Sequence, residues 1–176
     1  SNKTKYYDGT NWTVQPGTMN TSRSNISGCG IQTAALAAAG EPNTAVVEEW
    51  NGSSWTTAPS LNTARVNQGP AMMQGTSSDA VILGGNPPYP SQARAIENWD
   101  GTSWSTSPVS LVSQGNEQAA GQGSSASSVS AFGGSAGASL AEQFNKSINT
   151  ITAAAWAAGG NLNTTRRSMH AGQCGL

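Results

Sequence analysis

Two aromatic residues flanking an Asp-Gly or Asn-Gly turn recur along the chain, and this repeat constrains its fold more than any other feature. Three copies share one spacing: Tyr7–Trp12, Trp50–Trp55 and Trp99–Trp104. A fourth, stretched copy runs from Phe144 to Trp156. A period in the forties is typical of repeats that pack on their neighbours, such as propeller blades or solenoid turns. The repeat therefore predicts architecture strongly and function much less.

The composition is polar and nearly neutral. The 176 residues carry a formal net charge of -1 with only eight Lys and Arg, which excludes a nucleic-acid footprint and a polybasic membrane surface. With 10% charged residues, the surface is more typical of an extracellular or virion particle than of a crowded cytosol. No apolar run reaches about 18 residues, so no transmembrane helix is expected. The first five residues do not resemble a signal peptide.

Each unit contains four strand-like runs. In the best-formed unit these are residues 65–74, 79–85, 93–99 and 103–105, bounded by Gly, Pro, Asn and Asp as strands of all-β proteins are. Asp-Gly or Asn-Gly between two runs is a strong hairpin signal, because both residues tolerate positive φ. The fourth copy has Asn145-Lys146 instead, which predicts an elongated hairpin.

An Asn-Thr-x-Arg sequence follows three of the four tryptophans at a nearly fixed distance. It ends at Arg23, Arg65 and Arg166, and the place that follows Trp104 reads Leu111–Gln114 instead. Asn and Thr side chains bond nearby backbone groups, and an arginine can reach adjacent carbonyls. The motif therefore predicts a structural turn.

These residues resemble the kelch repeat. Its opening arginine, Gly-Gly strand end, aromatic-Asp strand end and following tryptophan stand here as Arg65, Gly84-Gly85, Trp99-Asp100 and Trp104. The resemblance covers essentially the whole chain and weakens in its last two units. The particular sequence of the repeat is similar to that of kelch-like repeats in structural proteins of bacteriophages from aquatic environments. The resemblance implies an all-β, kelch-like β-propeller of about four blades of four antiparallel strands, one blade incomplete, or an arc of a larger propeller.

We expect a single repeat domain over residues 1–176. Its units are 1–22 (partial), 23–64, 65–113, 114–165 and 166–176 (partial), which gives fifteen strands. A sixteenth strand would complete a four-blade ring, and the lack of an evident cap at either end favours a piece of a longer protein instead. The positions expected to be structural are Trp12, Trp55, Trp104, Trp156, Arg23, Arg65, Arg166, Gly85 and Gly134.

No pattern predicts catalysis, a metal site or a cofactor. His170 is the only histidine and has no nearby cluster of metal-ligating residues, so a copper site of the galactose-oxidase type is not expected. Glu48 and Glu49 are adjacent on a strand and point to opposite faces, so they cannot form a glycosidase pair. We expect a protein that is not an enzyme.

Non-repeating residues are better binding candidates than the recurrent tryptophans, for which packing between blades is expected. Asn86, Pro88 and Tyr89 lie in an insert between the second and third strands, at a rim where propellers bind ligands. Asn145 and Lys146 mark the irregular hairpin of the fourth copy.

Two other segments yield weaker expectations. The serine-rich stretch 121–130 is expected to be a loop with a strand edge. Cys29 and Cys174 fall in the same strand of the repeat. They are either buried thiols or a disulfide that joins the first copy to the last.

The function hypothesis is a non-enzymatic structural and binding protein of a virion, such as a decoration, fibre or appendage protein, located on the virion or outside the cell. Expected partners are other virion or surface proteins, a second copy of the chain and host glycans, with no nucleic acid and no membrane insertion. The alternative is a secreted, lectin-like bacterial propeller that binds carbohydrate. A propeller-based hydrolase or oxidase ranks third.

Overall fold

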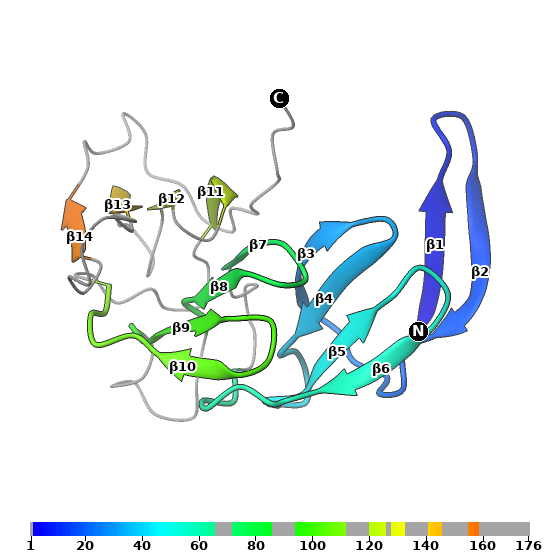
Figure 1. Cartoon of the computed structure of the whole chain (residues 1–176), viewed down its shortest axis with the longest axis horizontal. Coiled ribbons are helices and arrows are strands. Elements are labelled where there is room, and N and C mark those ends of the chain that lie inside the picture. The colour runs from blue at the N-terminus through cyan, green and yellow to red at the C-terminus, as the bar shows by residue number, and fades with distance from the viewer. Residues whose placement is uncertain are drawn as a thin grey trace.

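The described part of the chain is built from antiparallel β-strands. A computed structural model describes residues 2–65, 72–85, 94–111, 120–125, 128–132, 141–145 and 155–158. These residues form fourteen strands in one two-stranded and three four-stranded sheets, with no helix among them (Figure 1). The all-β prediction is confirmed.

The strands follow chain order within every sheet, and each is antiparallel to the next. The hairpin contains β1 (Lys3–Tyr7) and β2 (Trp12–Thr18). Blade 1 contains β3 (Ser27–Ile31), β4 (Ala34–Ala38), β5 (Val47–Trp50) and β6 (Trp55–Ala58). Blade 2 contains β7 (Met72–Gly75), β8 (Ala80–Leu83), β9 (Ile96–Trp99) and β10 (Trp104–Thr106). Blade 3 contains β11 (Ala120–Ser125), β12 (Ser128–Phe132), β13 (Ala141–Asn145) and β14 (Ala155–Ala158).

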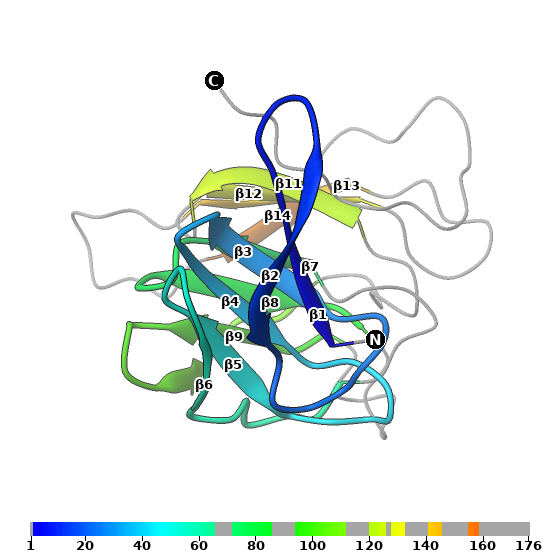
Figure 2. The ribbon, with the colours of Figure 1, turned by 90° about the vertical axis from the view of Figure 1, so that its right-hand side faces the viewer.

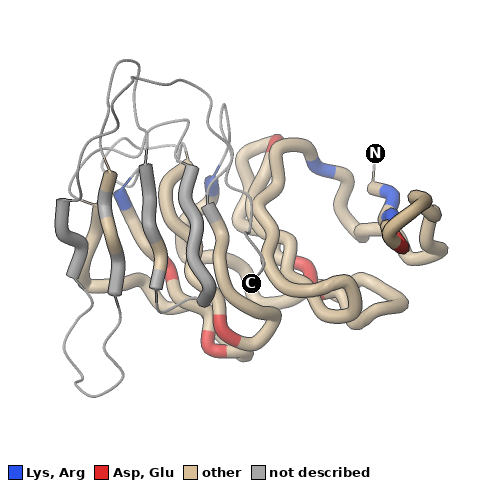
Figure 3. Tube along the Cα trace, turned by 90° about the horizontal axis from the view of Figure 1, so that it is seen from above, with Lys and Arg blue, Asp and Glu red and all other residues tan. Residues whose placement is uncertain are grey.

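The sheets are arranged as in a partial β-propeller. The first strands of neighbouring blades lie side by side, β3 against β7 and β7 against β11. Viewed from the hairpin, the blades stand one behind another (Figure 2). From above, the hairpin lies beside blade 1 at the opposite end of the molecule from blade 3 (Figure 3). The propeller architecture expected from the repeat is confirmed.

Each described Asx-Gly turn is closed in the same way. The Oδ1 atoms of Asp8, Asn51 and Asp100 accept bonds from the backbone N–H groups two and three residues later, at 2.7–2.9 Å. The following glycines have φ of 90–99°, a conformation that other residues rarely adopt. The turn sets the aromatic pairs opposite each other, with ring centroids 5.2–5.4 Å apart.

The backbone donors also act on the two aspartates. Bonds from Asn11 and Thr10 lower the pKa of Asp8, and bonds from Ser103 and Thr102 lower the pKa of Asp100. A bonded carboxylate is favoured over the protonated acid, which accepts such bonds less well.

The main core lies in the joint between blades 1 and 2. Blade 1 contributes Leu36, Ala38, Val47 and Ala58, and blade 2 contributes Met73, Ala80, Ile82, Trp99 and Trp104. A second core joins blade 2 to blade 3 through Val81, Leu83, Ile96, Leu111 and Val129. Alternate residues of β8 thus enter different cores, so this strand is apolar throughout and buried on both faces.

The expectation for the serine-rich stretch is partly wrong. Its strand edge is confirmed as part of β12, whereas residues 121–125, expected to be loop, belong to β11. β12 pairs with β11 on one edge and β13 on the other, and its Val129 is buried. Tertiary pairing and burial therefore override a composition with low strand preference.

Candidate functional site

A buried ion pair fastens the arginine of the repeat to the third strand of its blade. In blade 2, Nη2 of Arg65 donates to Oε1 of Glu97 at 3.0 Å, and Nη1 donates to the carbonyls of Gly84 and Ala95. Both charged side chains are fully buried. Burial lowers the pKa of Arg65, and the charge of Glu97 opposes that shift.

The same clamp occurs in blade 1. Nη2 of Arg23 donates to Oε1 of Glu48 at 2.9 Å, and Nη1 donates to the carbonyls of Ala39 and Val46. The backbone N–H of Asn20 donates to Oε2 of Glu48 at 2.6 Å, as that of Asn62 does to Glu97. Each glutamate therefore closes the turn and neutralises its arginine at the same time.

Sequence reasoning missed these two glutamates as the partners of the repeat arginines. Their signal was present, because Glu48 and Glu97 each stand two residues before the aromatic residue that precedes the Asx-Gly turn. Glu49 lies on the opposite face and is half-buried. The two buried carboxylates are engaged by arginine and by backbone N–H groups, which leaves them no free group for chemistry at the surface.

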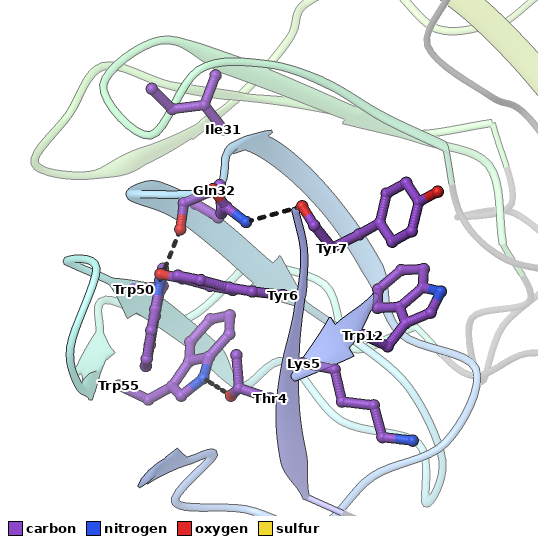
Figure 4. Close-up of a pocket in the computed structure, with 10 residues that line it drawn as sticks. Thr4, Lys5, Tyr6, Tyr7, Trp12, Ile31, Gln32, Trp50 and Trp55 are labelled. Carbon is purple, nitrogen blue, oxygen red and sulfur yellow. Dashed lines mark hydrogen bonds between the residues drawn. The ribbon is translucent and has the colours of Figure 1, made fainter. Parts of the chain in front are cut away.

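A groove of about 430 Å³ lies between the hairpin and blade 1 (Figure 4). We call it the edge groove. It is lined by Thr4–Tyr7 and Trp12 of the hairpin and by Ile31, Gln32, Ala35, Trp50 and Trp55 of blade 1. Thr4 and Tyr6 point towards Trp50 and Trp55, whereas Tyr7 and Trp12 lie on the other side of the hairpin. Tyr7 and Trp12 are 49% and 68% exposed.

Hydrogen bonds hold the hairpin on blade 1. The indole N–H of Trp50 donates to the Tyr6 hydroxyl at 2.7 Å and to the Gln32 carbonyl at 2.9 Å. The indole N–H of Trp55 donates to the Thr4 hydroxyl at 2.7 Å. At Gly17 a Cβ would overlap the Trp50 ring, so glycine there permits β2 to approach blade 1 closely.

A second groove of about 380 Å³ continues over the face of blade 1. This face groove is lined by Ile26–Gly30, Ala35–Ala37 and Trp55, and it shares Ala35 and Trp55 with the edge groove. In its thiol form, Cys29 has a pKa that burial raises to about 12. A thiol with that pKa is a poor nucleophile at neutral pH.

Most predicted binding residues lie outside the described residues, namely Asn86, Pro88, Tyr89 and Lys146. The same holds for the structural positions Gly134 and Arg166 and for His170 and Cys174. Asn145 is the last residue of β13, and Trp156 lies in β14. Gly85 follows β8 at the start of the insert. Because Cys174 is not described, both alternatives for Cys29 and Cys174, buried thiols or a disulfide, stay predictions.

Comparisons with known proteins support the fold alone. No family model and no curated protein sequence matches the chain. Among solved structures, 106 chains match, including the structure of YjhT, which has a propeller-like fold. That match has a TM-score of 0.69 at 11% sequence identity and covers 92% of this chain and 58% of that chain. This chain thus spans less than two thirds of its structural neighbour.

No helix in the described part of the chain is long and apolar enough to cross a membrane. No group of three or more His, Cys, Asp or Glu side chains in the same residues could hold a metal ion.

Proposed function

We propose that the chain is a non-enzymatic structural and binding module, a rigid stack of blades that holds variable loops at its rims. The observation that carries this proposal is that the buried charged residues bond to one another and to the backbone. Glu48 and Glu97 are fully buried and bonded to arginine and backbone N–H groups, so these glutamates serve the fold. Repeated residues build the scaffold, and residues outside the repeat are left to bind.

The blade topology supports display at two rims. The Asx-Gly turns and the β3–β4 and β7–β8 connections share one rim, whereas the arginine turns and the β4–β5 and β8–β9 connections share the other. β8 ends and β9 begins at the arginine rim, and the sequence between these two strands contains Asn86, Pro88 and Tyr89. A rigid scaffold holds such loops at a low entropic cost of binding.

The proposed setting is a virion or another extracellular assembly, where the module contacts neighbouring proteins or host glycans. The resemblance to kelch-like repeats of phage structural proteins supports this setting. The low charge supports it as well, since charged residues are scattered along the described trace (Figure 3). The kelch assignment and the phage origin are parts of the proposal.

A lectin-like, carbohydrate-binding propeller is the second candidate. The exposed rings of Tyr7 and Trp12 beside the edge groove favour it, because aromatic faces with polar neighbours suit ligands that are partly apolar.

A glycan array probed with the purified chain tests both candidates. If the rim insert contacts glycans, Tyr89→Ala removes the signal and Trp12→Ala keeps it. Loss of signal with Trp12→Ala alone assigns the binding to the edge groove and favours the lectin-like candidate. Cleavage or oxidation of a bound glycan, detected by mass spectrometry, contradicts the non-enzymatic proposal.

A further inference from the structure

The Asx-Gly turns accept either an amide or a carboxylate at their first position. Asn51-Gly52 is the only Asn-Gly pair in the sequence, whereas the other described turns begin with Asp8 and Asp100. In all three turns the closing hydrogen bonds from the backbone go to Oδ1, an atom that both types of side chain possess. The turn of blade 1 therefore does not depend on the amide nitrogen of Asn51.

An asparagine that precedes a glycine is chemically labile. The backbone nitrogen of the glycine attacks the side-chain carbonyl carbon of the asparagine and closes a five-membered imide ring. Glycine has no Cβ to shield its nitrogen or to restrict the backbone, so the ring closes more readily before glycine than before other residues. In a folded chain the reaction further depends on the surroundings of the electrophile, the nucleophile and the leaving group.

The electrophile, the side-chain carbonyl of Asn51, is held by two backbone donors. The N–H groups of Ser53 and Ser54 each donate to Oδ1 at 2.9 Å. These donors draw electron density away from the carbonyl carbon, and they would stabilise the negative charge that Oδ1 gains when the carbon is attacked. The same bonds fold the side chain back over the turn that contains Gly52.

The nucleophile and the leaving group are not engaged by other described residues. Among these residues, neither the backbone N–H of Gly52 nor Nδ2 of Asn51 donates a hydrogen bond. Asn20 and Asn62 differ, since each donates from Nδ2 to a carbonyl of an outer strand, at 3.2 and 3.1 Å. Both are followed by threonine, so they are internal controls for the reaction at Asn51.

The exposure of Asn51 does not depend on what adjoins blade 1. Asp100 holds the same place in blade 2, and it is exposed although blade 1 packs on that blade. Asp8 is exposed as well. The first position of the turn therefore stays in contact with water in a closed joint, and water is the only co-reactant that the chemistry requires.

We propose that Asn51 is a site of non-enzymatic deamidation in the folded chain. The backbone nitrogen of Gly52 gives its proton to hydroxide and forms a bond to Cγ of Asn51, and the bond from Cγ to Nδ2 breaks with release of ammonia. Water then opens the imide. Attack of water at Cγ restores the backbone and gives aspartate, whereas attack at the backbone carbonyl carbon gives isoaspartate. The net reaction consumes one water and releases one ammonia.

Blade 2 shows that the aspartate product fits the turn. There, Oδ1 of Asp100 accepts the same two backbone bonds, and Oδ2 accepts a bond from the Ser103 hydroxyl at 3.2 Å. Ser54 is the matching serine of blade 1. The aspartate product thus keeps the turn and adds one negative charge to its rim. The isoaspartate product adds a methylene group to the backbone of the hairpin, so it should melt at a lower temperature.

Peptide mapping by mass spectrometry, after incubation of the purified chain under physiological conditions, tests the proposal. Residue 51 should gain the mass difference between an amide and an acid, with release of an equal amount of ammonia. Asn20 and Asn62 in the same sample should react at least about tenfold more slowly, because their amide nitrogens are bonded and no glycine follows them. Alkaline pH should speed the reaction, since it favours loss of the Gly52 proton.

Two variants separate the turn from the rest of the chain. Asp100→Asn creates an Asn-Gly pair in the matching turn of blade 2, and residue 100 should then deamidate at a rate similar to that of Asn51. Asn51→Asp supplies the expected product directly. Its melting temperature should lie within about 2 °C of that of the original chain, and it should elute with the deamidated chain in ion exchange.

The proposal is overturned if Asn51 keeps its amide in the folded chain while the same chain in urea loses it at least about tenfold faster, since the turn would then protect the residue. Reaction of Asn20 or Asn62 at the rate of Asn51 also overturns it, because neither the turn nor the glycine would then select the site. A melting temperature lowered by more than about 5 °C in Asn51→Asp would contradict the acceptance of the product by the turn.

Discussion

The joint between blades 1 and 2 and the joint between the hairpin and blade 1 use the same repeat positions with different results. In the first, Trp104 is 7% exposed and the facing residues form a continuous core. In the second, Trp55 is only half-buried and two grooves remain. The difference shows that a repeat position sets where a side chain points, while its neighbour decides whether it is buried.

The two joints also differ in polarity. The Thr4 hydroxyl accepts the indole N–H of Trp55, whereas Val47 occupies the matching place opposite Trp104. The Trp104 indole N–H is buried without a partner among the described residues. The closed joint therefore gains apolar packing and forgoes a hydrogen bond, and the open joint does the reverse.

Breaking the buried ion pairs Arg23–Glu48 and Arg65–Glu97 should lower stability the most. The loss should be similar for the two pairs, although one lies in blade 1 and the other in blade 2. Glu97→Ala and Glu48→Ala each leave a buried arginine unpaired, which should lower the free energy of unfolding by about 3–5 kcal/mol. Glu49→Ala, on the opposite face of β5, should cost much less. Urea denaturation measures all three. A loss below about 1 kcal/mol for Glu97→Ala would show that the clamp is not needed for stability.

Removing equivalent tryptophans should separate the regions most clearly. Trp104→Ala empties a closed core and should cost about 3–5 kcal/mol. Trp12→Ala removes a ring that is 68% exposed and should change stability by about 0.5 kcal/mol or less. Thermal unfolding of the two variants provides the comparison. Equal losses would mean that Trp12 is covered in solution.

Exchanging the residues that face the indoles should have a smaller effect. Thr4→Val removes the acceptor of the Trp55 N–H and should cost about 0.5–1.5 kcal/mol. Val47→Thr offers a hydroxyl acceptor to the indole N–H of Trp104. Because this hydroxyl would have a partner, the substitution should lower the free energy of unfolding by less than burying an unpaired hydroxyl does. Urea denaturation measures both stabilities, and near-ultraviolet circular dichroism reports the indole surroundings. A large loss for Val47→Thr would show that the hydroxyl does not reach Trp104.

The turns should give the smallest effect, visible as a pH dependence. The pKa of Asp100 is lower in the folded chain than in the unfolded chain, so its contribution is present above the unfolded value near 3.8. That contribution is lost as the pH falls through the folded pKa. Asp100→Asn introduces the residue found at the equivalent position, Asn51. Because an amide does not titrate, the free energy of unfolding of this variant should fall less steeply below pH 4 than that of the original chain. Unfolding curves from pH 6 to 2 test this, and an unchanged pH profile would contradict it.

Much of the fold could be predicted from the sequence, because each structural task recurs in the same residues. The Asx-Gly turns and the spacing from Trp55 to Arg65 mark strand ends without reference to distant contacts. The repeat predicts four strands in the unit of β11, but the serine-rich residues of β11 do not show by themselves that they form one, since their structure comes from pairing with β12. The grooves also escaped prediction. Gly28 and Ala37 look unremarkable until the register aligns them with Met73 and Ile82.

Amide hydrogen exchange in β1 and β9 tests the central claim most directly, because these strands hold the same place in the open and the closed region. In the chain of residues 1–176, β1 should exchange much faster than β9, which is paired on both edges. Equal protection of β1 and β9 would contradict the account, because the edge of β1 would then be covered as that of β9 is.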